Sequence, residues 1–147
     1  MMHNWFLTKI RYEKVLEDGT QKKVTDQHLV DAISHTEAEA RIIEEMSHYI
    51  SGEFTVVGIV PAKYKEVFFT DDEAADKYYK CKLAFITLDE KSGAEKKTFS
   101  QVLVQASDLR DAIKKLDEGM RGSLADYEIC SVTETPIWDV YTFKSNE

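Results

Sequence analysis

The stretch that decides the fold is FLTKIRY at residues 6–12, because a matching stretch, YKCKLAF, occupies residues 79–85. Both stretches contain an aromatic residue, a small residue, a lysine, an aliphatic residue and a second aromatic residue in the same order, 73 positions apart. Alternation of this kind is typical of a β-strand, in which every second side chain lies on the same face. The preceding residues, Trp5 and Tyr78, are also both aromatic. The sequence therefore predicts two equivalent strands.

The segments that follow these two strands also match in order. Residues 17–20 and 91–94 place a glycine in a polar turn, which favours a hairpin because glycine accepts positive φ. A pair of lysines comes next in each copy, Lys22-Lys23 and Lys96-Lys97. We expect a second strand over residues 24–33 in the first copy and over residues 98–106 in the second.

A helix is predicted after each second strand. Residues 36–39, Thr-Glu-Ala-Glu, are typical of a capping box in which Thr36 caps the helix, and Ser107-Asp108 are expected to open the second helix. Gly52 and Gly122 lie beyond the helices and are expected to end them. The expected apolar stripes are Ala38, Ile42, Met46 and Tyr49 in the first helix, and Leu109, Ala112, Ile113, Leu116 and Met120 in the second.

The last part of each copy matches as well. Residues 54–59, FTVVGI, correspond to residues 127–132, YEICSV. Pro61 and Pro136 are expected to interrupt each copy before its final strand, because proline cannot donate a hydrogen bond to a central β-ladder. The final strands are expected at Glu66-Val67-Phe68 and at Asp139-Val140-Tyr141.

These matches predict an α+β fold built by tandem duplication of a β-β-α-β-β unit. We expect residues 1–147 to form a single domain, with repeat one at 1–75 and repeat two at 76–147. Residues 70–77 are expected to join the repeats as an acidic linker or a short helical turn. The two helices should pack on one mainly antiparallel sheet or on two facing sheets. The pattern does not specify the strand order.

Composition argues against several classes of function. The net charge of −8 disfavours binding to duplex nucleic acid or to anionic lipid, both of which depend on many lysine and arginine contacts. The sequence contains no apolar run of about 18 residues, the length that suggests a membrane span. Its first residues lack the basic and apolar regions of a signal peptide. We therefore expect a cytoplasmic protein that does not bind membranes.

The sequence contains no motif with established chemistry. His3, His28, His35 and His48 lack zinc-ligand spacing, and neither a phosphate-binding glycine loop nor a serine-nucleophile motif occurs. We accordingly predict no catalytic residue, no metal site and no cofactor. Cys81 and Cys130 fall at apolar positions of the strand pattern, which indicates buried free thiols.

Two duplicated features remain as candidate binding residues. Trp5 and Tyr78 are expected to point away from the faces of Phe6 and Tyr79, where they could anchor a partner protein or stack on a base. The alternative is a second packed face or a dimer interface. The duplicated lysines could form a symmetric phosphate-contacting patch, or could protect strand edges and promote solubility. These lysines are Lys9, Lys82, Lys22, Lys23, Lys96 and Lys97.

With these segments identified, the sequence resembles an uncharacterised family of gut-associated Bacteroidota and their phages, known as domain of unknown function 4494. The resemblance extends through nearly the whole chain. It implies no activity and no site residues. The stretches that carry it are residues 4–6, 9–14, 36–46, 50–55, 85–97 and 102–120.

Three functions follow as hypotheses. The leading one is a non-enzymatic binding or accessory protein that acts through protein–protein contacts, as a homodimer. The second is single-stranded nucleic-acid binding, through exposed strand aromatics and paired lysines. The third is an enzyme with a site between the repeats, which a pocket that contains His28 or His35 beside a carboxylate would favour.

Overall fold

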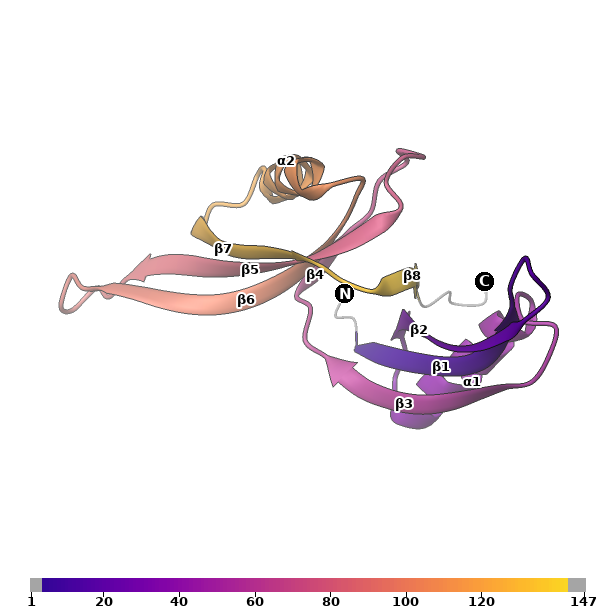
Figure 1. The fold of residues 1–147 in the computed structure, drawn as a ribbon. Coiled ribbons are helices and arrows are strands. Elements are labelled where there is room, and N and C mark those ends of the chain that lie inside the picture. The colour runs from indigo at the N-terminus through magenta and orange to yellow at the C-terminus, as the bar shows by residue number, and fades with distance from the viewer. Residues whose placement is uncertain (1–3, 143–147) are drawn as a thin grey trace. The chain divides into compact units, whose positions relative to one another are not determined.

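A computed structural model describes residues 4–142 of the chain. It contains two helices and eight strands, and the predicted α+β class is confirmed (Figure 1). The elements are β1 (Trp5–Val15), β2 (Gln21–Asp31), α1 (His35–Ser47), β3 (Phe54–Ala62), β4 (Glu66–Phe68), β5 (Lys77–Leu88), β6 (Glu95–Ala106), α2 (Leu109–Met120), β7 (Asp126–Glu134) and β8 (Ile137–Tyr141). Each predicted strand and helix is present within a few residues of its expected limits.

The strands form two four-stranded mixed sheets, with the orders β3-β1-β2-β8 and β4-β6-β5-β7. In each sheet the two hairpin strands and the third strand pair antiparallel, while the short edge strand, β8 or β4, pairs parallel. The chain divides into two compact units. Unit 1 consists of residues 1–63 and 136–147, and unit 2 consists of residues 64–135.

The last strand of each predicted repeat pairs with a strand of the other repeat. β4 follows β3 in the chain, yet it lies beside β6, and β8 lies beside β2. The two edge strands occupy matching registers, because residues 66–68 oppose residues 102–104 and residues 139–141 oppose residues 28–30. The limits of the compact units therefore differ from the predicted repeat boundary at residues 75 and 76. Duplication as the origin of this arrangement stays an inference.

A β-bulge occurs at the same place in both sheets. The register of β1 with β3 shifts between Lys9 and Ile10, so that Val57 is the extra residue, and the register of β5 with β7 shifts between Lys82 and Leu83, so that Cys130 is the extra residue. A bulged residue leaves the regular alternation of faces. The expectation that Cys130 is a core residue is therefore wrong: Cys130 is exposed, whereas Cys81 is buried as expected.

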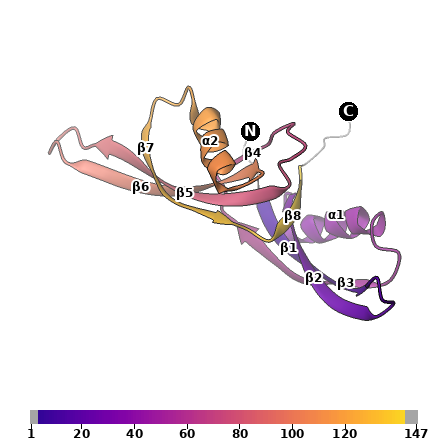
Figure 2. The same cartoon turned by 45° about the horizontal axis from the view of Figure 1, so that its top comes forward.

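Each helix covers one face of the sheet in its own unit, and the core lies between helix and sheet (Figures 1 and 2). The clusters of buried residues between helix and sheet come in unit 1 from β1, β2, α1 and the loop residue Ala32, and in unit 2 from β5, β6 and α2. In unit 1 they are Ile10, Val30, Ala32, Ala38, Ile42 and Met46. In unit 2 they are Tyr79, Cys81, Leu83, Val102, Val104, Ala106, Ala112 and Leu116.

The helix ends differ in part from the prediction. Ser34, not Thr36, caps α1, because its side chain accepts a hydrogen bond of 3.1 Å from the backbone N–H of Glu37. Asp108 caps α2 as expected and accepts from the backbone N–H of Asp111. The carboxylate of Asp111 in turn accepts from the backbone N–H of Ser107, the residue before the cap, so an aspartate ties the start of the helix to the preceding backbone.

Several positions near the helices are also corrected. Tyr49 lies beyond the end of α1 and is 73% exposed, so it is not part of the buried stripe. Leu109 and Ile113 are exposed as well. Gly122 adopts a φ of 93°, which fits the expected helix stop, whereas Gly52 has no positive φ. Pro61 lies inside β3, where an edge strand tolerates the missing donor.

The β1–β2 and β5–β6 hairpins extend past the third strand of their sheets. β3 pairs with β1 no further than Tyr12, and β7 pairs with β5 no further than Ile86. The tip of the β5–β6 hairpin is visible at the left of Figure 1. The hairpin tips contain Gly19 and Gly93, both with positive φ, as the turn pattern predicts.

Candidate binding site

A cavity of about 310 Å³ opens in unit 1 beside the C-terminal end of α1. It is lined by side chains from β1, β2, β8 and the end of α1 with the residues after it, and half of the lining side chains carry an aromatic ring. The lining residues are Tyr12, Lys14, Asp26, His28, Met46, Tyr49, Ile50, Trp138, Asp139 and Tyr141. We refer to this site as the unit 1 cavity.

Asp26 holds two aromatic side chains of the unit 1 cavity in place. Its Oδ2 accepts a hydrogen bond of 2.8 Å from the hydroxyl of Tyr12, and its Oδ1 accepts one of 3.0 Å from Nε1 of Trp138. Burial, together with this hydrogen bond and the negative charge of Asp26, raises the pKa of Tyr12 to about 12. The phenol is therefore protonated at neutral pH and acts as a donor to the carboxylate.

His28 is a buried imidazole in the same lining. It is 5% exposed, and its ring stacks on the ring of Tyr141 with 5.8 Å between centroids. Its Nδ1 is buried and has no hydrogen-bond partner among the residues that the structure describes. Burial lowers the pKa of His28, against the opposing attraction of Asp26 and Asp139. The imidazole is accordingly neutral at neutral pH.

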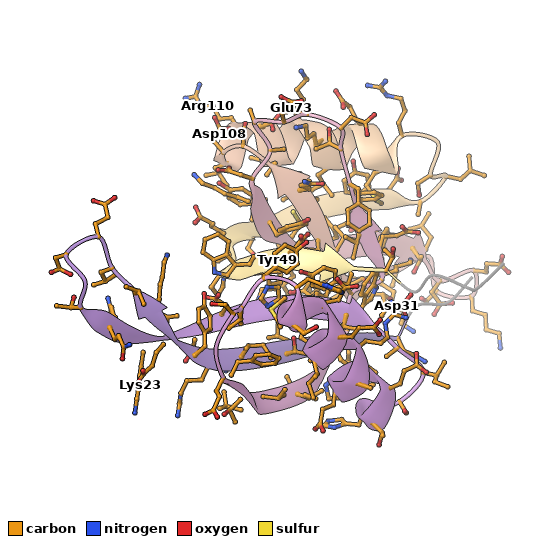
Figure 3. All side chains as sticks on the ribbon, turned by 90° about the vertical axis from the view of Figure 1, so that its right-hand side faces the viewer. Lys23, Asp31, Tyr49, Glu73, Asp108 and Arg110 are labelled. Atoms are coloured by element: carbon orange, nitrogen blue, oxygen red, sulfur yellow. The ribbon has the colours of Figure 1, made fainter. Side chains whose placement is uncertain are left out.

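The rim of the unit 1 cavity is accessible to a ligand. Trp138 is 65% exposed and Tyr49 is 73% exposed, although both are large aromatic side chains. Figure 3 labels Tyr49 among the side chains of unit 1. Lys14, on the exposed part of β1, contributes the only lysine or arginine of the lining. The cavity thus combines a buried polar floor with an exposed aromatic rim.

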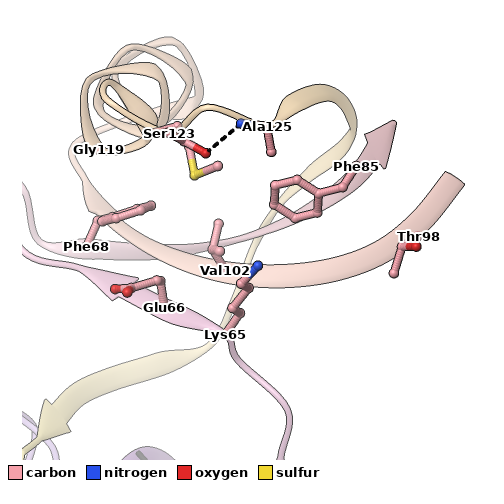
Figure 4. A pocket seen from close by; sticks show the side chains of 10 residues that line it. Lys65, Glu66, Phe68, Phe85, Thr98, Val102, Gly119, Ser123 and Ala125 are labelled. Atoms are coloured by element: carbon pink, nitrogen blue, oxygen red, sulfur yellow. Dashed lines mark hydrogen bonds between the residues drawn. The ribbon is translucent and has the colours of Figure 1, made fainter. Parts of the chain in front are cut away.

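A second cavity, of about 470 Å³, occupies the equivalent place in unit 2 (Figure 4). Its lining residues are Lys65, Glu66, Phe68, Phe85, Thr98, Val102, Gly119, Met120, Ser123 and Ala125. Several of them match the unit 1 lining by register. Phe85 corresponds to Tyr12, and Val102 corresponds to His28. We refer to this site as the unit 2 cavity.

The unit 2 cavity is lined by apolar core side chains at positions where unit 1 has polar rings. Phe68, Phe85, Val102 and Met120 belong to the unit 2 core or pack against it. The ammonium group of Lys65 lies over the ring of Phe85, 4.5 Å from its centroid. No buried imidazole and no carboxylate–aromatic network corresponds to those of unit 1 in this lining.

The structure places the predicted aromatic residues, Trp5 and Tyr78, inside the protein. Each is only 4% exposed. A ring with so little accessible surface presents no face for stacking on a base, and it cannot anchor an external partner in this conformation. Their burial argues against both roles and favours the alternative of a second packed face.

The predicted lysines are all exposed, but they do not gather in one patch within either sheet. In unit 1, Lys23 opposes Glu13, whereas Lys22 opposes Lys14 on the other face of the β1–β2 hairpin. Lys9 lies on the Lys23 face by alternation, and Figure 3 shows Lys23 extending from this hairpin. Each lysine pair is therefore split between two faces.

The same separation occurs in unit 2. Lys97 forms an ion pair of 3.3 Å with Glu128, and the ammonium group of Lys82 lies 4.9 Å from the centre of the Phe99 ring. Lys96 opposes Thr87 on the other face of the hairpin. Two of the lysines therefore already have partners within the sheet.

The unit 1 cavity was not predicted from the sequence. His28 was expected to matter only if the protein were an enzyme, and no role was predicted for Asp26 or Trp138. A signal was present, however, because the two repeats differ in polarity at matched positions, with Tyr12 against Phe85 and His28 against Val102. A comparison of the repeats for their differences would have pointed to this lining.

Within residues 4–142, no group of three or more histidine, cysteine or acidic side chains is placed to hold a metal ion. Neither α1 nor α2 has the length and apolar character needed to cross a membrane. His3 lies outside the described residues.

Comparison with known proteins identifies the family. A family model described as "Domain of unknown function (DUF4494)" matches residues 4–143. No curated protein and no solved structure matches the chain. The chain belongs to the DUF4494 family, as the resemblance in the sequence led us to expect.

Proposed function

We propose that this member of the DUF4494 family is a non-enzymatic binding protein that contacts a partner protein through the unit 1 cavity. One observation carries the proposal: Asp26 fixes the rings of Tyr12 and Trp138 around an open cavity. Preorganised aromatic rings reduce the entropy lost on binding. A side chain that projects from a partner would fill the space between them.

The rim supports contact with a protein. Tryptophan and tyrosine are enriched among the residues that dominate interface energetics, because they bury large areas with few rotatable bonds. Trp138 and Tyr49 leave most of their surface accessible. A partner that covers both would exclude water from the cavity, and this would strengthen the polar contacts inside.

A catalytic role has less support. The unit 1 cavity does bring His28 near two carboxylates, Asp26 and Asp139, as the enzyme hypothesis required. However, both oxygens of Asp26 accept hydrogen bonds from aromatic side chains, and the ten lining residues include no serine, threonine or cysteine. A nucleophile with a positioned base is the usual requirement for covalent catalysis. Binding is the chemistry that this arrangement supports best.

Single-stranded nucleic-acid binding also has less support. The hypothesis required exposed strand aromatics, but Trp5 and Tyr78 are buried. It also required clustered cations, whereas each lysine pair is split between two faces and Lys97 is paired with Glu128. Carboxylates in the unit 1 cavity would repel phosphate groups.

A selection of random dodecapeptides on the immobilised full-length protein tests the proposed function. We expect enriched peptides to bind the wild-type protein and to lose about tenfold or more in affinity when Trp138 and Tyr49 are both replaced by alanine. Leu124→Ala is the matched control, because Leu124 is a fully exposed apolar residue of unit 2. If no peptide is enriched, or if the double variant binds as well as the control, the proposal fails.

Other expectations from the sequence stay predictions. These are a cytoplasmic location, a homodimer, an origin in Bacteroidota or their phages, and a duplication that produced a single domain of two repeats. Sedimentation at several concentrations would test the homodimer directly.

A further inference from the structure

We propose that the group bound in the unit 1 cavity is the guanidinium of an arginine side chain on the partner. This inference rests on the proposed function and specifies its chemistry. Three independent features of the lining point to a planar cation that donates hydrogen bonds. They are its charge, its aromatic faces and the buried imidazole of His28.

The charge of the lining favours a cation. Asp26 and Asp139 contribute two carboxylates, and Lys14 contributes one ammonium group, which lies on the exposed end of β1. The hydrogen bonds that Asp26 accepts from Tyr12 and Trp138 come from neutral donors, so they leave its negative charge without compensation. A cation that enters the cavity would supply that compensation in a site partly removed from water.

The aromatic faces favour the same ligand. Tyr12, Tyr49, Trp138 and Tyr141 all line the cavity. Aromatic rings attract cations through the negative potential of their faces, and tryptophan does so most strongly. A guanidinium group is planar and weakly hydrated, so it stacks on such rings at a smaller desolvation cost than an ammonium group. This difference favours arginine over lysine.

The imidazole of His28 sets a requirement for donors. Its Nδ1 is buried without a partner among the described residues, and an unpaired buried polar atom costs free energy. Because the ring is neutral, one of its nitrogens is unprotonated, and in the tautomer with the proton on Nε2 the buried Nδ1 can accept a hydrogen bond. Guanidinium offers five N–H donors in a fixed plane, whereas a quaternary ammonium group offers none. A fully methylated ligand would therefore leave this requirement unmet.

The unit 2 cavity supplies the internal contrast. Val102 replaces the imidazole there, and the ammonium group of Lys65 already lies over the ring of Phe85. A lysine from the protein itself thus occupies the cation–aromatic contact in unit 2. In unit 1 the corresponding residue along the edge strand is Trp138, which adds another ring to the lining. Arginine binding is therefore expected in unit 1 alone.

The experiment uses the indole N–H signal of Trp138 in two-dimensional ¹H–¹⁵N NMR spectra of the full-length protein. The probes are N-acetyl-arginine methylamide and its uncharged isostere, N-acetyl-citrulline methylamide. Trp5 supplies an internal reference because it is buried. We expect the arginine probe to shift the Trp138 signal with a dissociation constant on the order of 1 mM. The citrulline probe should bind about tenfold more weakly or not at all.

Variants that change the charge of the lining test the direction in which arginine affinity changes. Lys14→Gln removes a cation from an exposed site, so it should tighten arginine binding, whereas the same change would weaken the binding of an anion. Asp26→Asn keeps an oxygen that can accept from Trp138 but removes the charge, and should reduce arginine affinity about tenfold. Glu66→Gln is the matched control, because Glu66 lines the unit 2 cavity, and it should change nothing.

Each outcome decides the proposal. Equal binding of arginine and citrulline, weaker binding by the Lys14→Gln protein, or no shift of the Trp138 signal would overturn it. In any of these cases the proposed function still stands if the selected peptides depend on Trp138 and Tyr49. If those peptides also fail to appear, both proposals are wrong.

Discussion

Unit 1 and unit 2 share a framework but differ in the side chains that line the cavity beside the end of each helix. Both have the same strand order, a bulge at the same place in the third strand and a helix on one face. In unit 1 the cavity is lined by Tyr12, Asp26 and His28, among others. In unit 2, Phe85 occupies the position equivalent to Tyr12, and Val102 occupies the position equivalent to His28.

The shared framework extends to the helix that follows each hairpin. In α1, Arg41 lies one turn after Glu37 and donates a hydrogen bond of 2.7 Å to the carbonyl of Thr142, just after β8. In α2, Lys115 lies one turn after Asp111 and pairs with Asp72, shortly after β4, at 3.1 Å. Each helix thus uses a cation at the same turn to hold the segment that follows the short edge strand.

The comparison distinguishes the residues that stabilise the fold in both units from the residues that line a cavity in one unit. Interior positions such as Ile42 and Leu116 are apolar in both units because burial of apolar surface stabilises the framework. His28 adds a buried hydrogen-bonding group to unit 1 at a position where unit 2 has Val102. A buried imidazole without a partner lowers stability. Its presence in one of two matched cavities therefore argues that it serves recognition.

The largest expected effect tests whether the two cores are equivalent. Ile42→Ala in unit 1 and Leu116→Ala in unit 2 each remove a fully buried side chain at matched positions of the two helices. Each should lower the free energy of unfolding by about 2–5 kcal/mol, because the truncation loses apolar burial and leaves a cavity. Urea denaturation followed by circular dichroism measures both. A loss below 1 kcal/mol in only one unit, a bound taken from the typical cost of surface changes, would break the equivalence.

The next effect concerns the bulge and the two thiols. Burial raises the pKa of Cys81 from 9.0 to about 11, whereas Cys130 is exposed at the bulge of β7. We expect iodoacetamide to modify Cys130 at least about a hundredfold faster than Cys81 in the native protein, because the thiolate is the reactive form. Peptide mapping by mass spectrometry distinguishes the two sites. Similar rates would contradict the burial of Cys81, and urea should make the rates equal as a control.

Much of the framework was predictable from the sequence. Alternation and the 73-residue spacing predicted the strands, and the glycines at residues 19 and 93 predicted the hairpins, because these signals are local. The edge strands were also located correctly at residues 66–68 and 137–141, within two residues. Their partners were not predicted, since strand pairing depends on contacts distant in sequence that no local pattern encodes. The pairing of β4 with β6, for example, was not predicted.

The bulge and the site were missed for related reasons. A bulge changes the face of a side chain without changing the residue pattern, so Cys130 was expected in the core. Trp5 and Tyr78 were considered as exposed anchors because alternation assigns a face but does not say what covers it. Asp26 gained its role from Trp138, which lies 112 positions away in the sequence. Such a pairing follows from topology, which the sequence pattern left open.

A smaller effect tests the close approach of helix and strand in unit 2. A Cβ atom at Gly119 would lie 2.8 Å from the ring of Phe68, which is closer than van der Waals contact allows. Gly119→Ala should therefore destabilise the protein by about 1–2 kcal/mol, although alanine favours a helix. Glu45→Ala in α1 is the matched control and should change stability little. A stabilised Gly119→Ala protein, measured by denaturation, would show that Phe68 moves aside freely.

The smallest effect is expected from a substitution that gives the unit 1 cavity the residue found at the matched position of unit 2. His28→Val places the unit 2 residue in unit 1, and it removes the buried imidazole whose Nδ1 has no partner in the described part of the chain. We expect the variant to gain about 1 kcal/mol in the free energy of unfolding at neutral pH. It should also lose arginine binding in the Trp138 titration. Val102→Ala is a control for the loss of packing in the other unit.

The pH dependence of that variant sharpens the comparison further. Because the pKa of His28 is lowered in the folded protein, the unfolded chain binds more protons as the pH falls below the ordinary value of about 6.5. The free energy of unfolding of the wild-type protein should therefore decrease as the pH falls below that value, and reach a plateau above it. The His28→Val protein lacks this contribution, so its advantage should grow from pH 8 to pH 5. An advantage that stays constant between these pH values would mean that the imidazole titrates normally, and that burial does not keep it neutral.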